Sequence, residues 1–340
     1  MTRVAAIDCG TNSIRLLVAD IDPEAGTLVD LDRRMEVVRL GQGVDRTGRI
    51  APEAMARTLD AARRYAAICT DLGVEAIRFV ATSASRDAEN RDEFVAGVRD
   101  ALGVEPEVIG GVEEAALSFR GATGMIGRPG PYLVIDLGGG STEVVLGEQS
   151  PAAAHSMDVG CVRITERHLL SDPPTPEQVA AAVADVHAAL DVAIAEVPVG
   201  RTRTLVGVAG SVTTVTAHAL GLDRYRPDRI DGATLTVDQV VAACDDLIAR
   251  DRDSRAALGF MHPGRIDVIA AGALIWREVV LRVQREVAAA GGSLTEVVTS
   301  EHDILDGIAW SIATPPDPPR PDPPRLTHPR LTHSRLIHPA

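Results

Sequence analysis

VIDLGGGSTEVVLG, residues 134–147, is the stretch of the sequence that decides the fold. An apolar strand runs into Asp136, three glycines and a Ser-Thr pair follow, and a second apolar strand carries Glu143. Glycine lets a ligand reach backbone N–H groups without meeting a Cβ, and successive N–H groups in such a turn form a concave anion site. Carboxylates repel phosphate, so their presence on both sides predicts a divalent cation between protein and phosphate. The alternative is a tight hairpin whose glycines serve geometry only.

A near copy of this stretch, AIDCGTNSIRLL, stands at residues 6–17. When Asp136 is placed on Asp8, the apolar positions on both sides coincide and Arg15 falls on Glu143. Two copies of one strand–turn–strand unit weaken the purely geometric explanation of the glycines. They also predict two related domains that face each other across a cleft.

The rest of the chain alternates between strand-like and helix-like periods, which predicts an α/β protein. The expected strands span 4–9, 14–20, 27–40, 76–82, 105–109, 132–137, 141–147, 152–159 and 204–210, and the expected helices span 52–73, 88–102, 113–122, 211–221 and about 265–289. We expect one domain over 1–126 and a second over 127–312, whose last helix can pack back on the first. A tail over 313–340 follows.

This tail differs in composition from the body. TPPDPPRPDPPR is followed by the near-repeats RLTHP, RLTHS and RLIHP. Such a segment cannot bury enough apolar surface to order itself, so we expect a disordered, Pro/Arg/His-rich extension. We interpret its histidines as part of a solvated extension and not as metal ligands.

Composition and charge exclude several classes of protein. The chain has 340 residues, 45% of them hydrophobic, and a formal charge of −14. All its basic residues are arginines, which excludes the P-loop, Schiff-base and protein-kinase lysines. The acidity argues against nucleic acid as a partner. No apolar run approaches the roughly 20 residues that span a bilayer, so we expect no membrane partner. The isolated cysteines and the strand pattern at the N-terminus predict a cytoplasmic protein without a signal peptide.

A candidate general base lies in IGGVEEAALSFRG, residues 109–121. A strand ends at the two glycines and a helix begins near Glu113 and Glu114. Acidic residues in a first turn usually complement the helix dipole, which is worth roughly 0.3–1 kcal/mol. We expect at least one of the pair to do only that. The alternative is that one of them points into the cleft and takes a proton from water as a general base.

Two more strand ends offer groups that bind phosphate. In VATSASR, Arg86 follows a strand at the end where ligand clefts of α/β proteins open, which suits phosphate clamping. The alternative is a surface ion pair with Asp87 or Glu89. In GVAGSV, Gly210 and Ser211 begin a helix after a strand and offer a second phosphate-binding helix N-terminus.

With these motifs assembled, the sequence resembles the exopolyphosphatase/guanosine pentaphosphate phosphatase (Ppx/GppA) family of the acetate and sugar kinase/heat-shock/actin (ASKHA) superfamily. AIDCGTNSIRLL, GVEEA, VIDLGGGSTEVVLG, HPGRIDVIAAGAL and SEHDILDGI look like family segments, and the chain is most similar to the short actinobacterial members. The resemblance covers residues 1 to about 312. It implies two RNase H-like domains around an interdomain cleft, a homodimer as one possible assembly, and Mg²⁺-dependent hydrolysis, with Mn²⁺ as an alternative cofactor.

The resemblance also implies a role for each matching residue. Glu114 becomes the base that activates water. Asp136 and Glu143 become metal-associated carboxylates, and Asp8 is their counterpart in the first copy. The groups that hold phosphate become Asn12, Ser13, Arg15, Arg86, Gly138, Gly139, Gly140, Ser141, Gly210, Ser211 and Arg265.

Four functions remain open from the sequence. The first is an exopolyphosphatase that removes the terminal phosphate of inorganic polyphosphate. The second is a phosphohydrolase that converts pppGpp to ppGpp, which differs from the first in pocket shape. The third is a superfamily kinase or ATPase, and the fourth is a non-catalytic sensor of alarmone or polyphosphate. GVEEA favours water as the nucleophile over a sugar or acyl acceptor.

Overall fold

The structure is a computed structural model that describes residues 1–124 and 126–313. The predicted tail therefore lies, from residue 314 on, outside the described residues. The helices are α1 (Val44–Thr47), α2 (Pro52–Asp71), α3 (Ser83–Asp87), α4 (Arg91–Leu102), α5 (Gly111–Thr123), α6 (Cys161–His168), α7 (Pro176–Glu196), α8 (Ala209–Ala219), α9 (Pro227–Ile230), α10 (Val237–Ala249), α11 (Arg252–Ala256), α12 (Ile269–Ala289) and α13 (Ile304–Ala313), with 3₁₀ turns η1 (Val199–Arg201) and η2 (Pro263–Arg265).

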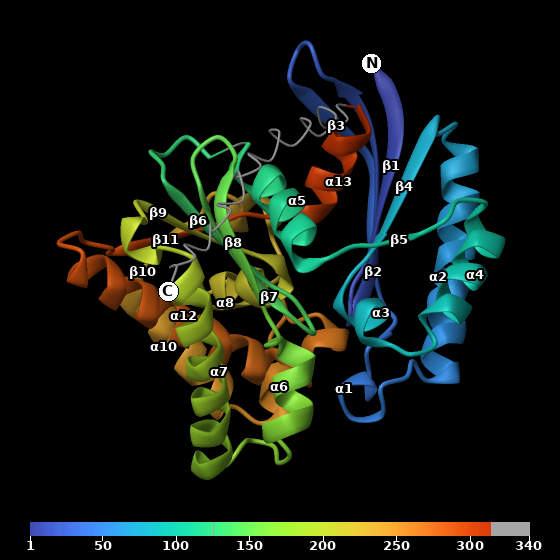
Figure 1. The fold of residues 1–340 in the computed structure, drawn as a ribbon. Helices are drawn as coiled ribbons and strands as arrows, with labels where there is room; N and C mark the ends of the chain where they lie inside the picture. Colours follow the sequence, from blue (N-terminus) through green and yellow to red (C-terminus); the bar gives the residue numbers. More distant parts are fainter. Residues whose placement is uncertain (125, 314–340) are drawn as a thin grey trace, which may run out of the picture.

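Two mixed sheets organise the molecule (Figure 1). The first has the order β3-β2-β1-β4-β5, from β1 (Thr2–Cys9), β2 (Ser13–Asp22), β3 (Thr27–Val37), β4 (Ala76–Ala81) and β5 (Glu107–Val108). The second has the order β10-β11-β9-β6-β7-β8, from β6 (Tyr132–Leu137), β7 (Thr142–Gly147), β8 (Pro151–Met157), β9 (Thr204–Val208), β10 (Thr234–Thr236) and β11 (Glu296–Thr299). In each sheet an antiparallel three-stranded unit is extended by two parallel strands, and the second sheet has β10 as a further, antiparallel edge strand.

The two sheets repeat one another down to single residues. Asp8 lies opposite Arg15 across β1 and β2, and Asp136 lies opposite Glu143 across β6 and β7. Each connecting turn is closed by the same bond at 3.0 Å, from Gly10 N to Ser13 O in the first turn and between the equivalent glycine and serine in the second. The predicted pair of related α/β domains is confirmed.

Alternation along the strands divides side chains between two faces of each sheet. On β1, Ala5, Ile7 and Cys9 join a core with α2 and α4, whereas Val4 and Ala6 face α13. The second sheet has its larger core on the side of α6, α7, α8, α10 and α12, and its other face is covered by α5. The central strands of each sheet are therefore buried on both faces, whereas the edge strand β3 stays largely exposed.

The helices α5 and α13 lie between the two sheets and are exchanged between the halves of the chain (Figure 1). α5 comes from the first half but places Ala115 and Phe119 against the second sheet. α13 comes from the end of the second half but covers the first sheet. The two helices meet backbone to backbone, because a Cβ on Gly121 would lie 1.8 Å from Asp303 O and one on Gly307 would lie 2.0 Å from Leu117 O.

Some predicted elements differ in their boundaries. The expected helix over 88–102 begins only at Arg91, because Ala88 has extended backbone angles and separates α4 from α3. The helix expected from about residue 265 begins at Ile269, after a 3₁₀ turn. The short strands β10 and β11 were not predicted, since three or four residues carry too little periodicity to be recognised.

Within the described residues, α7 is the one helix that is long and apolar enough to cross a membrane by length and composition alone. It carries charged residues that pair with neighbouring helices. Asp185 accepts a bond from Arg167 of α6 at 3.2 Å, and Asp191 accepts one from Arg282 of α12 at 2.7 Å. In this structure α7 packs against the other helices of the second domain.

Candidate active site

A cavity of about 100 Å³ lies where the two strand–turn–strand units meet. It brings together the predicted residues Asp8, Asn12, Ser13, Arg15, Glu114, Asp136, Gly138, Gly139, Ser141, Glu143, Gly210, Ser211 and Arg265. These residues come from the two turns and their strands, the first turn of α5, the start of α8, and η2. The sequence therefore anticipated most of the lining, although its members are far apart along the chain.

The two turns present a set of backbone donors. Thr11, Asn12, Gly139, Gly140 and Ser141 have N–H groups without a protein acceptor among the described residues. The carbonyls of the same turns are occupied, since the first turn receives bonds from the segment after β3 and the second from the start of α6. Backbone N–H groups left free in successive residues form a concave site for anions.

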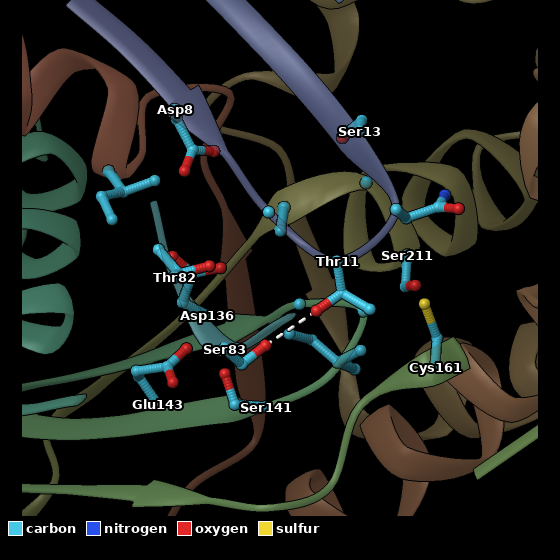
Figure 2. A pocket seen from close by; sticks show the side chains of 18 of the residues that line it. Asp8, Thr11, Ser13, Thr82, Ser83, Asp136, Ser141, Glu143, Cys161 and Ser211 are labelled. Atoms are coloured by element: carbon cyan, nitrogen blue, oxygen red, sulfur yellow. Dashed lines mark hydrogen bonds between the residues drawn. The ribbon is translucent and has the colours of Figure 1, made fainter. Parts of the chain in front are cut away.

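Hydroxyl groups extend this donor set around the cavity. Figure 2 shows Thr11 and Ser83 joined by a hydrogen bond of 2.7 Å, with Ser141 beneath them on the opposing turn. Ser211 lies at the far side of the same view, beside Cys161. Hydroxyls both donate and accept, so this lining can bind the oxygens of a phosphate in either protonation state.

Asp136 and Glu143 lie on neighbouring strands and are nearly inaccessible to solvent. Burial raises the pKa of Asp136 to about 7, and the nearby charge of Asp303 adds to the effect. Burial and the charges of Glu114 and Asp136 raise the pKa of Glu143 well above its ordinary value. Ser118 donates a hydrogen bond to Asp136, and Ser156 donates one to Glu143 at 2.7 Å. The pair can bind a cation or hold a proton.

Glu114 and Glu113 take different roles in the first turn of α5. Glu113 is exposed and pairs with Arg78, whereas Glu114 is only 7% exposed and lines the cavity. Burial raises the pKa of Glu114 to about 7, although Arg86 beside it acts in the opposite direction. A carboxylate with a pKa near the working pH is suited to general base catalysis.

The two arginines of the cavity have different surroundings. Arg15 donates to Asp8 from Nε at 2.9 Å and from Nη2 at 2.6 Å, and its Nη1 donates to Asp303. Arg265 has no carboxylate partner among the described residues, and its closest acceptor is Thr214 Oγ1 at 3.4 Å. Arg265 is therefore the arginine available to a phosphate, while Arg15 is held by two carboxylates.

The residues present fit a divalent cation. The cavity is lined by four carboxylates and two guanidinium groups, so phosphate needs additional positive charge there. Mg²⁺ commonly takes one or two protein carboxylates and keeps several waters, which suits Asp136 and Glu143. Asp8 is less suited, because Arg15 occupies it. Within the described residues, no three His, Cys, Asp or Glu side chains are grouped so as to hold a metal by themselves.

Two predicted residues do not line the cavity. Gly140 is not part of the lining itself, and the space beside its Cα is filled, since a Cβ would lie 2.4 Å from Ser83 Oγ; it contributes to the site only through its backbone N–H. Arg86 donates from Nη1 to Glu114 Oε2 at 3.1 Å and to Ile109 O at 3.0 Å. Among the described residues Arg86 therefore makes no surface pair with Asp87 or Glu89, because α3 turns its side chain toward the start of α5. Its role as a phosphate clamp stays a prediction.

Sequence reasoning missed several residues of the cavity and its surroundings. Asp303 holds Arg15, and Ser118 holds Asp136. Ser118 follows Glu114 by one helical turn, so i to i+4 spacing was an available signal. Ala209 lines the cavity at the start of α8 with φ 71°, a left-handed conformation that is uncommon for alanine and gathers at functional sites. No local pattern indicated it.

Comparison with known proteins places the chain in a family. The model of the Ppx/GppA phosphatase family matches residues 17–301. The chain belongs to this family. It is 50% identical over 321 residues to "Exopolyphosphatase 2" of Mycobacterium tuberculosis, covering 92% of this chain and 99% of that protein. The crystal structure of an exopolyphosphatase-like protein superposes with a TM-score of 0.88 at 46% identity, covering 92% of this chain and 98% of that one.

A more distant relative carries a different name. "Guanosine-5'-triphosphate,3'-diphosphate pyrophosphatase" of Aeromonas salmonicida is 31% identical over 294 residues, covering 86% of this chain and 58% of that protein. Ppx/GppA members are phosphatases, so this chain is a hydrolase of phosphoric anhydrides. Membership in the family decides against the kinase and the non-catalytic sensor, and the two RNase H-like domains of the ASKHA type agree with it.

Proposed function

We propose that this protein is a Mg²⁺-dependent exopolyphosphatase, which hydrolyses the terminal phosphate of inorganic polyphosphate and releases orthophosphate. The observation that carries the proposal is Glu114, a buried carboxylate with a pKa of about 7 in a cavity with two phosphate-binding turns. The name and the 50% identity of the M. tuberculosis relative support it.

Different residues of the chain bind the phosphate, accept the proton and position the base. The N–H groups of the two turns and the hydroxyls of Ser141 and Ser211 bind the oxygens of the terminal phosphate. Glu114 accepts the proton of a water that approaches phosphorus in line with the leaving phosphate. Arg86 holds the Glu114 side chain in one orientation, because it also bonds the carbonyl of Ile109.

Asp136 and Glu143 would hold the Mg²⁺, with Asp8 as a third carboxylate nearby. When bound, the ion offsets the charge of the phosphate oxygens and of the carboxylates around it. The donors of the two turns are fixed in place before the reaction, so they need no reorganisation as charge develops on the phosphate. Arg265, which has no carboxylate partner in the described part of the chain, binds the next phosphate of the substrate.

The lining favours a linear polyphosphate over a nucleotide. Among the described residues that line the cavity there is no phenylalanine, tyrosine or tryptophan. Nucleobases are usually held by stacking on aromatic side chains or by apolar walls. Hydrolysis of pppGpp to ppGpp is the second candidate, which the Aeromonas salmonicida relative supports by its name. All four cysteines are free and buried, which supports a reducing, cytoplasmic location.

The test is phosphate release by the full chain from long polyphosphate, tripolyphosphate, pppGpp and ATP, with and without Mg²⁺. We expect Glu114→Gln to lower kcat on polyphosphate by roughly 10²–10⁴-fold, the usual contribution of a general base. Glu113→Gln is the matched control, since Glu113 is the exposed neighbour on the same turn. The wild-type rate should fall as the pH drops below about 7, because Glu114 must be ionised to accept a proton.

Three outcomes would contradict the proposal. Faster release from pppGpp than from polyphosphate would favour the second candidate. Full activity in a folded Glu114→Gln protein would remove Glu114 as the base. If the protein were fully active in the presence of a chelator and adding Mg²⁺ did not increase its activity, the proposed dependence on Mg²⁺ would be wrong.

A further inference from the structure

The three glycines of the second turn are all held from behind by α6. Gly138 O accepts from Cys161 N at 3.0 Å, and Gly139 O accepts from Val162 N at 2.9 Å. Gly140 O accepts instead from a side chain, Arg163 Nε at 2.8 Å. Carbonyl and N–H of a peptide unit point in opposite directions. Carbonyls directed at α6 therefore turn the following N–H groups away from it, toward the side on which the phosphate site lies.

Arg163 does more than hold Gly140. Its Nη1 donates to Asp45 at 2.5 Å and its Nη2 donates to Asp87 at 2.6 Å. Asp45 lies on α1 and Asp87 at the end of α3, so both belong to the first domain, whereas Arg163 and Gly140 belong to the second. The side chain of Arg163 is only 12% exposed. One shielded guanidinium therefore joins the phosphate-binding turn to two carboxylates across the interdomain cleft.

We propose that Arg163 is a positioning residue that couples closure of the two domains to the orientation of the peptide between Gly140 and Ser141. The proposal rests on the function proposed above. When Asp45 and Asp87 move away, the guanidinium loses two of its three acceptors and no longer has a fixed orientation. Because Gly140 has no Cβ, the peptide between Gly140 and Ser141 can then rotate. Ser141 N–H faces the phosphate only while the domains are closed.

This coupling makes hydrolysis depend on a closed cleft. An open cleft binds the chain end with an incomplete donor set. Closure completes the set and shuts out bulk solvent, while the attacking water stays beside Glu114. Only arginine can do this, because its planar fork offers five N–H donors to three acceptors that lie in different directions. A lysine in its place keeps the charge but cannot bond all three.

Arg167, one turn later on α6, supplies a matched control. It also reaches Asp45, at 2.7 Å from Nε, and it pairs with Asp185 of α7 at 3.2 Å. It therefore makes the same kind of interdomain pair but no contact with the turn. If a bridge to Asp45 were all that mattered, Arg163→Ala and Arg167→Ala would behave alike.

The experiment measures kcat and KM on tripolyphosphate, Kd for inorganic phosphate by calorimetry, and Tm, for Arg163→Ala, Arg163→Lys and Arg167→Ala in the full chain. Loss of one oxyanion donor costs roughly 10²–10³-fold in kcat, and a loosened donor costs less. We expect Arg163→Ala to lower kcat by roughly 10- to 100-fold and to weaken phosphate binding, and Arg163→Lys to remain impaired. Arg167→Ala should stay within about threefold of wild type. Guanidinium ion at low millimolar concentration should restore part of the activity of Arg163→Ala alone.

Equal kcat and equal phosphate Kd in the two alanine variants would overturn the proposal, as would full activity of Arg163→Lys. If the wild type released phosphate from no substrate, the proposed function would fail. The phosphate Kd would still decide whether Arg163 positions the turn, because binding requires no turnover.

Discussion

Replacement of Gly160 by alanine tests whether α6 sets the position of the phosphate-binding turn. Gly160 immediately precedes α6 and has φ −147° and ψ 163°, an extended conformation open to any residue. The change therefore adds no backbone strain, and its effect comes from contact alone. A Cβ at this position would lie 2.3 Å from Gly139 O and 2.5 Å from Gly140 N.

The size of the effect follows from these distances. Ordinary contacts of a Cβ begin near 3.4 Å, so the turn must retreat by about 1 Å. Overpacking of this kind costs typically 1–3 kcal/mol of stability. A displacement of about 1 Å at the reacting groups can cost roughly 10²-fold in rate. We therefore expect Gly160→Ala to lower kcat/KM on polyphosphate by about 10²-fold, with a fall in Tm of several degrees.

The assay compares Gly160→Ala with Gly110→Ala, using phosphate release and thermal unfolding. Gly110 precedes α5 as Gly160 precedes α6, also with extended backbone, and a Cβ there meets no atom within 4 Å. The control thus removes any general effect of alanine at a helix N-terminus. If the two variants retained the same kcat/KM, close contact between α6 and the turn would not govern activity, and the reasoning would be refuted.

Two further predictions concern stability. Gly121→Ala places a Cβ 1.8 Å from Asp303 O and should lower the free energy of unfolding in urea by about 3 kcal/mol. In the control Gly124→Ala, the Cβ would meet Arg120 O at 3.6 Å and no other described atom outside its chain neighbours and its own helix within 4 Å, so the change should be less than about 1 kcal/mol. Equal effects of the two substitutions would contradict close backbone contact between α5 and α13. Asp136→Asn should raise Tm at pH 8 without Mg²⁺. It should also abolish the rise in Tm that we expect Mg²⁺ to produce in the wild type. The folded pKa of this group, about 7, lies above its unfolded value, so its contribution to stability is full at low pH and is lost as the pH rises to about 7. A lower Tm of the variant at pH 8 would contradict the assignment.

Local pattern carried much of the fold and the site. The alignment of Asp8 with Asp136 gave the repeated strand–turn–strand unit, and the register of both sheets agrees with it. Glycine-rich turns between apolar strands can be recognised in a sequence because glycine is the residue type that gives the backbone this conformational freedom. A strand–glycine–helix pattern also placed Glu113 and Glu114 at the start of α5, and the family resemblance then singled out Glu114.

What the sequence left open depends on contacts between distant segments. Arg86 follows a strand in the sequence, and only the path of α3 shows that its side chain bonds Glu114. Arg163 lies in a helix start without any recognised motif, and its three partners come from three separate segments. Asp303 belongs to a recognised segment, but its pairing with Arg15 follows from the return of α13 to the first sheet. Periodicity describes neighbours along the chain and carries no information on such encounters.

The exchange of α5 and α13 has a consequence for how the protein is made. Synthesis proceeds from the N-terminus, and the first sheet is complete in sequence once β5 has emerged from the ribosome. One face of that sheet nevertheless stays uncovered until Ile304, Leu305 and Ile308 arrive nearly 200 residues later. A nascent chain with an exposed apolar sheet is prone to aggregate and is a natural client of chaperones. Translation speed and chaperone supply should therefore affect the yield of this protein more than they affect proteins whose domains close in the order of synthesis.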